Sequence, residues 1–80
     1  MKSIRFTRGS RKHRIGRQHA RHVMATNAPS ITTDPETGAV MQSWIGTDER
    51  GRELEIVAID RPECLLVIHV MPTALRGEGR

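Results

Sequence analysis

The sequence lacks the features that usually staple a small protein or anchor it to a membrane. Its 80 residues include one cysteine, Cys64, so no internal disulfide can form, and no Cys/His group has the spacing of a zinc site. No apolar run approaches the ~18 residues of a membrane span, and the N-terminus has no apolar signal-peptide region. These absences predict one cytoplasmic domain with a thin hydrophobic core.

Aromatic residues are almost absent, because Phe6 and Trp44 are the only two and there is no tyrosine. Two rings are too few for the base-stacking platform of common RNA-binding folds. Trp44 is interpreted either as the largest core residue or as a ring that stacks one base. A glycine-rich phosphate loop and a serine nucleophile elbow are also missing, which excludes the enzyme classes built on them.

Acidic residues are missing from the first 33 positions, which hold eight lysines and arginines and carry a charge of +8. The rest of the chain holds five arginines against nine acids and carries −4. Such asymmetry indicates a polyanionic partner, either nucleic acid or an acidic protein. The nucleic-acid-binding candidates are the bases around the expected helices: Arg8, Arg11, Lys12, Arg14, Arg17 and Arg21. Pairing of Arg17 or Arg21 with Glu53 or Glu55 would reduce this free charge.

Hydrophobic periodicity and turn residues predict the order of elements. Alternation predicts a short strand over Lys2–Thr7. Ser10 is expected to cap a helix that starts at Arg11 and runs to Asn27. Gly16 leaves two interpretations open: one weakened helix, or a short helix followed by a second over Arg17–Thr26. Further strands are expected over Ser30–Thr33, Ala39–Thr47, Arg52–Ile59 and Cys64–Met71.

These elements predict an α+β fold, in which a short N-terminal strand and one or two basic helices pack on a three- to four-stranded antiparallel sheet. Residues 1–72 are expected to form the domain and residues 73–80 a flexible tail. Strict alternation in the last strand groups His69 with Leu65, Val67 and Met71.

The order of motifs resembles that of small RelE-superfamily toxins of the BrnT-like kind. The resemblance extends over nearly the whole chain and rests on Phe6-Thr7-Arg8, on Ile15-Gly16 before a helix ending at Asn27-Ala-Pro29, and on the segments Trp44–Asp48, Gly51–Val57 and Leu66–Pro72. It implies a RelE-like two-layer sandwich and a toxin of a type II toxin–antitoxin system. Such a toxin acts as a metal-independent endoribonuclease on free or ribosome-bound mRNA, and a cognate antitoxin neutralises it.

Catalytic candidates follow from this chemistry, which needs an acid, a base and cations. His69 is the one polar residue in an apolar strand, and it acts either in catalysis or as a hydrogen-bonded residue at the core edge. The resemblance implies a role for an arginine near the C-terminus, here Arg76, and Arg61 is a further candidate. His19 and His22 are spaced for chelation but lack further ligands, so no metal or other cofactor is expected. The alternative function is a non-catalytic module that binds nucleic acid or an acidic partner.

Overall fold

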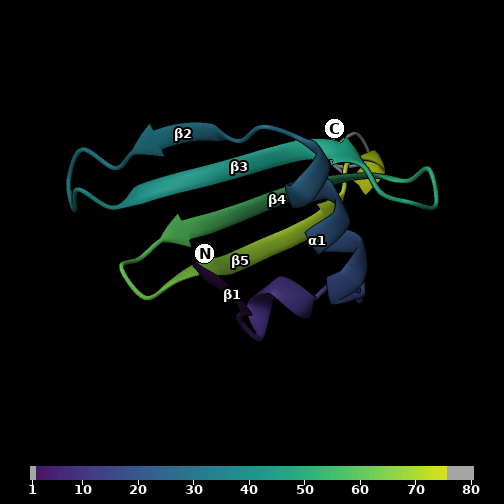
Figure 1. Ribbon diagram of the computed structural model, residues 1–80, viewed down its shortest axis with the longest axis horizontal. Helices are drawn as coiled ribbons and strands as arrows, with labels where there is room; N and C mark the ends of the chain where they lie inside the picture. The colour runs from purple at the N-terminus through teal and green to yellow at the C-terminus, as the bar shows by residue number, and fades with distance from the viewer. Residues whose placement is uncertain (1, 76–80) are drawn as a thin grey trace.

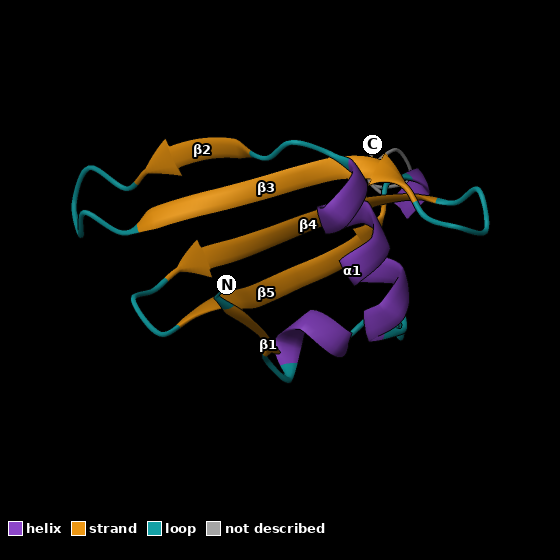
Figure 2. Ribbon diagram, viewed as in Figure 1, coloured by secondary structure: helices purple, strands orange, loops and turns teal. Residues whose placement is uncertain are grey.

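A computed structural model describes residues 2–75 of the chain. The regular structure from β1 to β5 is a mixed sheet with a helical layer on one face (Figures 1 and 2). The elements in chain order are β1 (Ser3–Phe6), the single 3-10 turn η1 (Gly9–Arg11), α1 (Arg17–Thr26), β2 (Ser30–Thr33), β3 (Val40–Thr47), β4 (Glu53–Asp60) and β5 (Cys64–Pro72).

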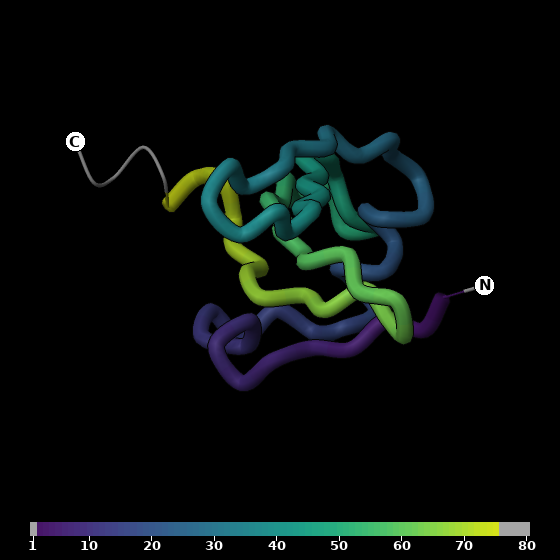
Figure 3. Tube along the Cα trace, turned by 90° about the vertical axis from the view of Figure 1, so that its left-hand side faces the viewer, coloured from purple at the N-terminus to yellow at the C-terminus, as the bar shows by residue number. Residues whose placement is uncertain are grey.

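The sheet has five strands in the order β1-β5-β4-β3-β2. Strands β2 to β5 form the expected antiparallel meander, but β1 pairs parallel to β5, with Ser3 opposite Cys64 and Phe6 opposite Val67. The side view shows β1 beneath β5 (Figure 3). The α+β class is confirmed. The sheet differs from the predicted three- to four-stranded antiparallel one because β1 joins the four antiparallel strands as a fifth, parallel strand. The connection through η1 and α1 carries the chain from β1 at one edge of the sheet to β2 at the other edge, and the meander then returns to β5. Parallel neighbours need such a long crossover, so β1 can run parallel to β5.

Two of the hairpin turns are built alike, from an aspartate side chain and a glycine. Asp34 Oδ1 accepts the backbone N–H of Glu36 at 2.8 Å, and Asp48 Oδ1 accepts that of Arg50 at 2.8 Å. Gly38 and Gly51 then adopt φ of 75° and 85°, a left-handed conformation that suits glycine. These turns set the register of the meander, so each of the four predicted strands after α1 is found within one residue of its expected bounds.

The helical region follows the second of the two expected arrangements, because a break at Gly16 separates η1 from α1. Ser10 does not cap a helix at Arg11, and that prediction is wrong. Instead Ser10 lies inside η1, 1% exposed, and its hydroxyl donates to the Thr7 carbonyl at 2.6 Å. Since η1 is a single 3-10 turn and α1 is the one α-helix between β1 and β2, the helical layer is smaller than two full helices would make it.

The core lies between α1 and one face of the sheet. Ala20 and Val23 of α1 are fully buried in the same cluster as Trp44, Ile56 and their neighbours on the central strands. The C-terminal end of α1 approaches β3 closely: a Cβ on Gly46 would lie 2.2 Å from Asn27 Nδ2. Glycine at position 46 is therefore what lets the helix end pack on the strand. No helix of residues 2–75 is long and apolar enough to cross a membrane.

A β-bulge in β5 changes which residues share a face of the sheet. Val57 pairs with His69 and Ala58 with Val67, so Ile68 is the extra residue. The bulge moves His69 to the face opposite buried Val67 and Val70, and the predicted grouping of His69 with Leu65 and Val67 is wrong. Beyond β5, Thr73 still bonds to the Glu53 carbonyl at 3.1 Å, and residues 76–80 lie outside the described part of the chain.

Candidate functional site

The loop between β1 and α1 is anchored at two buried points and carries its bases between them. The first anchor is Ser10, which is buried and whose backbone N–H donates to Thr7 Oγ1 at 3.1 Å. Ile15, which is 8% exposed, accounts for the second because it belongs to the core cluster. Arg11, Lys12 and Arg14 lie between the anchors and are all exposed. The local fold therefore holds these cationic side chains out of the core and in solvent.

Arg14 lies in this loop with a left-handed backbone, at φ 57°. It is the single non-glycine residue with positive φ among residues 2–75. This conformation costs a residue with a Cβ about 1–2 kcal/mol, and glycine avoids the cost. The Arg14 side chain is exposed and forms no hydrogen bond or ion pair with the described residues, so the fold gains nothing visible from arginine here. Strain retained at a residue with no structural role is typical of functional positions.

The start of α1 adds two further bases and has no acidic counterpart. Gly16 is the N-cap and supplies no side-chain cap, and the first turn holds no acid. A Cβ at position 16 would lie 3.2 Å from His19 Cδ2, so the close ring of His19 leaves little room for a capping side chain. Arg17 and Arg21 are exposed one turn apart. Arg21 reaches toward β1, with its guanidinium carbon 5.9 Å from the Phe6 ring centroid.

The predicted nucleic-acid-binding residues therefore share one layer of the molecule. We use the term basic surface for the exposed side chains of Arg8, Arg11, Lys12, Arg14, Arg17 and Arg21. No member forms an ion pair with a carboxylate of residues 2–75. Glu53 accepts a hydrogen bond from Thr73, and Glu55 lies 3.3 Å from His69, so neither glutamate neutralises Arg17 or Arg21. The basic surface keeps the charge that the sequence places there.

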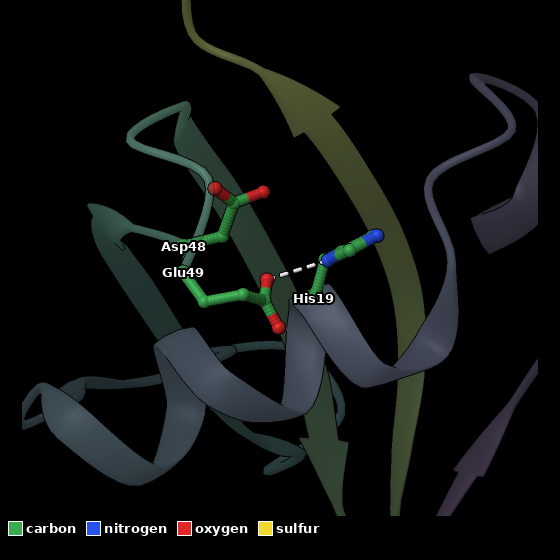
Figure 4. A group of neighbouring side chains, drawn as sticks. All are labelled: His19, Asp48 and Glu49. Atoms are coloured by element: carbon green, nitrogen blue, oxygen red, sulfur yellow. Dashed lines mark hydrogen bonds and ion pairs between the residues drawn. The ribbon is translucent and has the colours of Figure 1, made fainter.

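A cluster of His19, Asp48 and Glu49 lies where α1 meets the β3–β4 turn (Figure 4). One potential ligand atom from each residue lies within 4.8 Å of the other two. His19 Nδ1 donates to Glu49 Oε1 at 2.5 Å, since a carboxylate can only accept. That bond lowers the pKa of Glu49 below its usual value, although partial burial acts in the opposite direction.

Asp48 is already saturated by bonds within its own turn. Its Oδ1 accepts the N–H groups of Arg50 and Arg52 at 2.8 and 3.0 Å, and its Oδ2 accepts Nη2 of Arg50 at 2.7 Å and Nε at 3.0 Å. Burial alone would raise the pKa of Asp48, but the bonds from the Arg50 side chain and from these backbone amides outweigh it and lower the pKa to about 2. A metal ion would have to displace Arg50, so these residues do not fit a metal centre.

His19 and Glu49 instead resemble the histidine–carboxylate pair of a general base. With Nδ1 donating to the carboxylate, Nε2 is the ring nitrogen that carries the lone pair in the neutral ring, as in other histidine bases. No residue within 2–75 bonds to His19 Nε2. The sequence shows the histidine but not its partner, because Glu49 lies 30 positions away in an ordinary turn and no local motif joins them. The His19–Glu49 pair was therefore not predicted from the sequence.

The predicted catalytic residues are not brought to the basic surface. His69 lies on the sheet face that α1 does not cover, with Nε2 3.3 Å from Glu55 Oε1. Arg61 is exposed in the β4–β5 turn, and Arg76 lies outside the described residues. Trp44 is 4% exposed and belongs to the core, which favours its interpretation as a core residue over base stacking.

Comparison with known proteins adds no assignment to this geometry. No protein-family model, curated protein or solved structure matches the chain.

Proposed function

We propose that the protein binds RNA through the basic surface. The observation that carries the proposal is that six exposed cations share one layer and none is paired with a carboxylate of residues 2–75. Like charges at this density repel one another, and a bound polyanion removes that cost. Five of the six are arginines, whose planar fork matches the oxygens of a phosphate group.

The salt dependence of RNA binding tests this proposal. Each single-strand phosphate contact contributes about −0.7 to the slope of log affinity against log salt, so six contacts predict a slope of about −4. Replacing Arg11, Arg14 and Arg17 with glutamine should remove about two units of that slope. Arg52→Gln is the matched control, because Arg52 is also exposed but lies at the β3–β4 turn. RNA affinity that does not change with salt, or an equal loss of slope in Arg52→Gln, would overturn RNA binding at the basic surface. Tight binding to acidic peptides without binding to RNA would assign the basic surface to a protein partner.

The His19–Glu49 pair favours a second candidate, a metal-independent endoribonuclease such as the toxin of a toxin–antitoxin pair. His19 Nε2 would take the proton of a ribose 2′-hydroxyl as its oxygen attacks the phosphorus. The leaving 5′-oxygen needs a proton, and His22 lies on the same flank of α1, three residues further on. Arginines of the basic surface would stabilise the charge that develops on the phosphate.

Substitution of the two candidate histidines distinguishes their roles. If His19 is the base, His19→Gln should reduce RNA cleavage by about 10²–10⁴-fold and relieve growth arrest in bacteria expressing the protein. Glu49→Gln should reduce cleavage less, because it removes only the orienting bond. His69→Gln should leave cleavage unchanged, whereas the reverse pattern would restore His69 as the catalytic candidate. Binding without any cleavage would leave the first proposal standing alone.

A further inference from the structure

Three of the four histidines lie in the part of the chain that carries the basic surface. His13 lies in the loop between Lys12 and Arg14, and His19 and His22 lie three residues apart on one flank of α1. All three residues are half-buried, so solvent reaches part of each. Histidine is the residue type whose charge ordinarily changes between about pH 5 and pH 8. The region of the basic surface therefore gains positive charge as the solution becomes mildly acidic.

Carboxylates lie where they neutralise little of this charge. Residues 2–33 contain none, and neither do β3 and β5, the strands that pack against α1 and η1. The other strand in contact with α1 is β4, whose three carboxylates are engaged elsewhere: Glu53 with Thr73, Glu55 with His69 and Asp60 with Lys2. The acids that face the helical layer are consequently those of the β3–β4 turn.

His19 differs from the other two histidines because those acids face it. Glu49 accepts the bond from its Nδ1, and Asp48 lies close by with its oxygens already bonded within the turn. When His19 is protonated, Glu49 balances the new charge in direct contact. The side chains of His13 and His22 form no hydrogen bond or ion pair with residues 2–75, so their added charge is free to meet a phosphate.

The size of the effect follows from the salt dependence of phosphate contacts. A protonated imidazole beside a phosphate makes a charge-assisted contact, as an arginine does. Each such contact to a single strand contributes about −0.7 to the slope of log affinity against log salt, which is about fivefold in affinity at about 0.1 M salt relative to about 1 M. Two histidines therefore predict a gain of about 25-fold and a slope that is steeper by about 1.4 in acid.

We propose that His13 and His22 make RNA binding at the basic surface depend on pH, so that the protein takes up protons as it binds and holds RNA more tightly in mildly acidic solution. A phosphate next to each ring favours the protonated form, and the protonated ring favours the phosphate by the same factor. This inference rests on the proposed RNA binding and adds its regulation.

Titration of a rhodamine-labelled 2′-O-methyl oligouridine between about pH 8 and pH 5.5 tests the inference. This RNA has no free 2′-hydroxyl to attack its own phosphates, and its bases do not titrate in that range. The wild type should bind about 25-fold more tightly at the acid end in about 0.1 M salt, and the gain should disappear near 1 M. His13→Gln combined with His22→Gln should lose most of the gain. His69→Gln is the matched control and should keep all of it, because His69 lies on the sheet face that α1 does not cover.

Calorimetry of the wild type in two buffers of different ionisation enthalpy measures the proton uptake directly, and it decides the question should the double variant fail to fold by circular dichroism. We expect RNA binding near pH 6.5 to take up protons. RNA binding without proton uptake, a folded double variant that keeps the full gain, or an equal loss in His69→Gln would each overturn this inference and leave RNA binding in place. Absence of RNA binding at every pH would instead overturn the proposed function, and this inference with it.

Discussion

Arg21 lies over the ring of Phe6 and ties α1 to β1. Its guanidinium carbon is 5.9 Å from the ring centroid, and its Nη2 donates to the Ile4 carbonyl at 3.5 Å. A cation over an aromatic face contributes about 0.5–1 kcal/mol at an exposed site. Arg21 is therefore the one member of the basic surface with a visible packing role, and the other members are better probes of ligand binding alone.

Arg14→Gly should stabilise the protein and weaken RNA binding at the same time. Glycine removes the strain of the left-handed backbone, so we expect the free energy of unfolding to rise by about 0.5–1 kcal/mol. The lost charge should reduce the salt slope by about 0.7. Urea denaturation and a salt titration measure the two effects.

Arg8→Gly is the control, because Arg8 has an ordinary right-handed backbone at φ −58°. It removes the same charge, but its stability should fall by about 0.5–1 kcal/mol because glycine adds entropy to the unfolded chain. Destabilisation by both changes would show that the backbone of Arg14 is not strained.

Gly46→Ala should destabilise the protein by about 1–3 kcal/mol, because the new methyl group meets the Asn27 side chain. Asn27→Gly in the same chain should recover part of the loss, since it removes the atoms in collision. Gly9→Ala is the comparison, with its nearest neighbour 3.9 Å away, and should change stability little. Thermal unfolding of these variants, of Asn27→Gly alone and of the wild type measures the effects; an additive double mutant would contradict a direct contact.

Asp48→Asn should flatten the dependence of stability on acid pH. The pKa of Asp48 falls from 3.8 to about 2 in the folded protein. The folded state therefore binds this proton less readily than the unfolded state, and the carboxylate contributes stability that is complete above about pH 5 and lost as the pH falls from about 4 to 2.

Urea midpoints between pH 7 and pH 2 measure this effect. The variant should be less stable than the wild type at pH 7 and should lose less on acidification. Glu63→Gln removes a carboxylate whose side chain bonds to none of the described residues, and it should keep the wild-type profile. A parallel profile for Asp48→Asn would show that the turn bonds do not hold the carboxylate ionised.

Binding of RNA should leave the fluorescence of Trp44 unchanged. The ring is 4% exposed within the core and is out of reach of a base. Saturating quenching by RNA that follows the binding isotherm would restore the stacking interpretation. Acrylamide should likewise quench the folded protein much less than the urea-unfolded chain.

Much of the fold was predictable because local signals agree along the meander. Alternation of apolar residues predicts β4, and the Asp/Gly turns predict where the strands end. The observed strand bounds agree with these predictions within one residue. The parallel pairing of β1 with β5 has no local signal, since it joins residues about 60 positions apart. The bulge at Ile68 also has no local sequence signal, because the strand around it is apolar. His69 was therefore assigned to the wrong set of neighbours.

Some features of the candidate site were likewise predictable from the sequence, and others were not. The exposure of the basic residues was predictable from the missing acids, because no nearby partner exists to bury them. The left-handed Arg14 and the His19–Glu49 contact arise from tertiary packing and leave no pattern in the sequence. Trp44 left two interpretations open, and the depth of the core favours one of them.

The pairing of β1 with β5 also determines when the domain can close. Its partner β5 is the last strand of residues 2–75, so during synthesis β1 has no neighbour in the sheet until residues 64–67 have left the ribosome. Until then, the arginine-rich connection that follows β1 is held only at its α1 end. The nascent chain therefore carries its densest positive charge on a segment that the sheet does not yet anchor, until β5 docks.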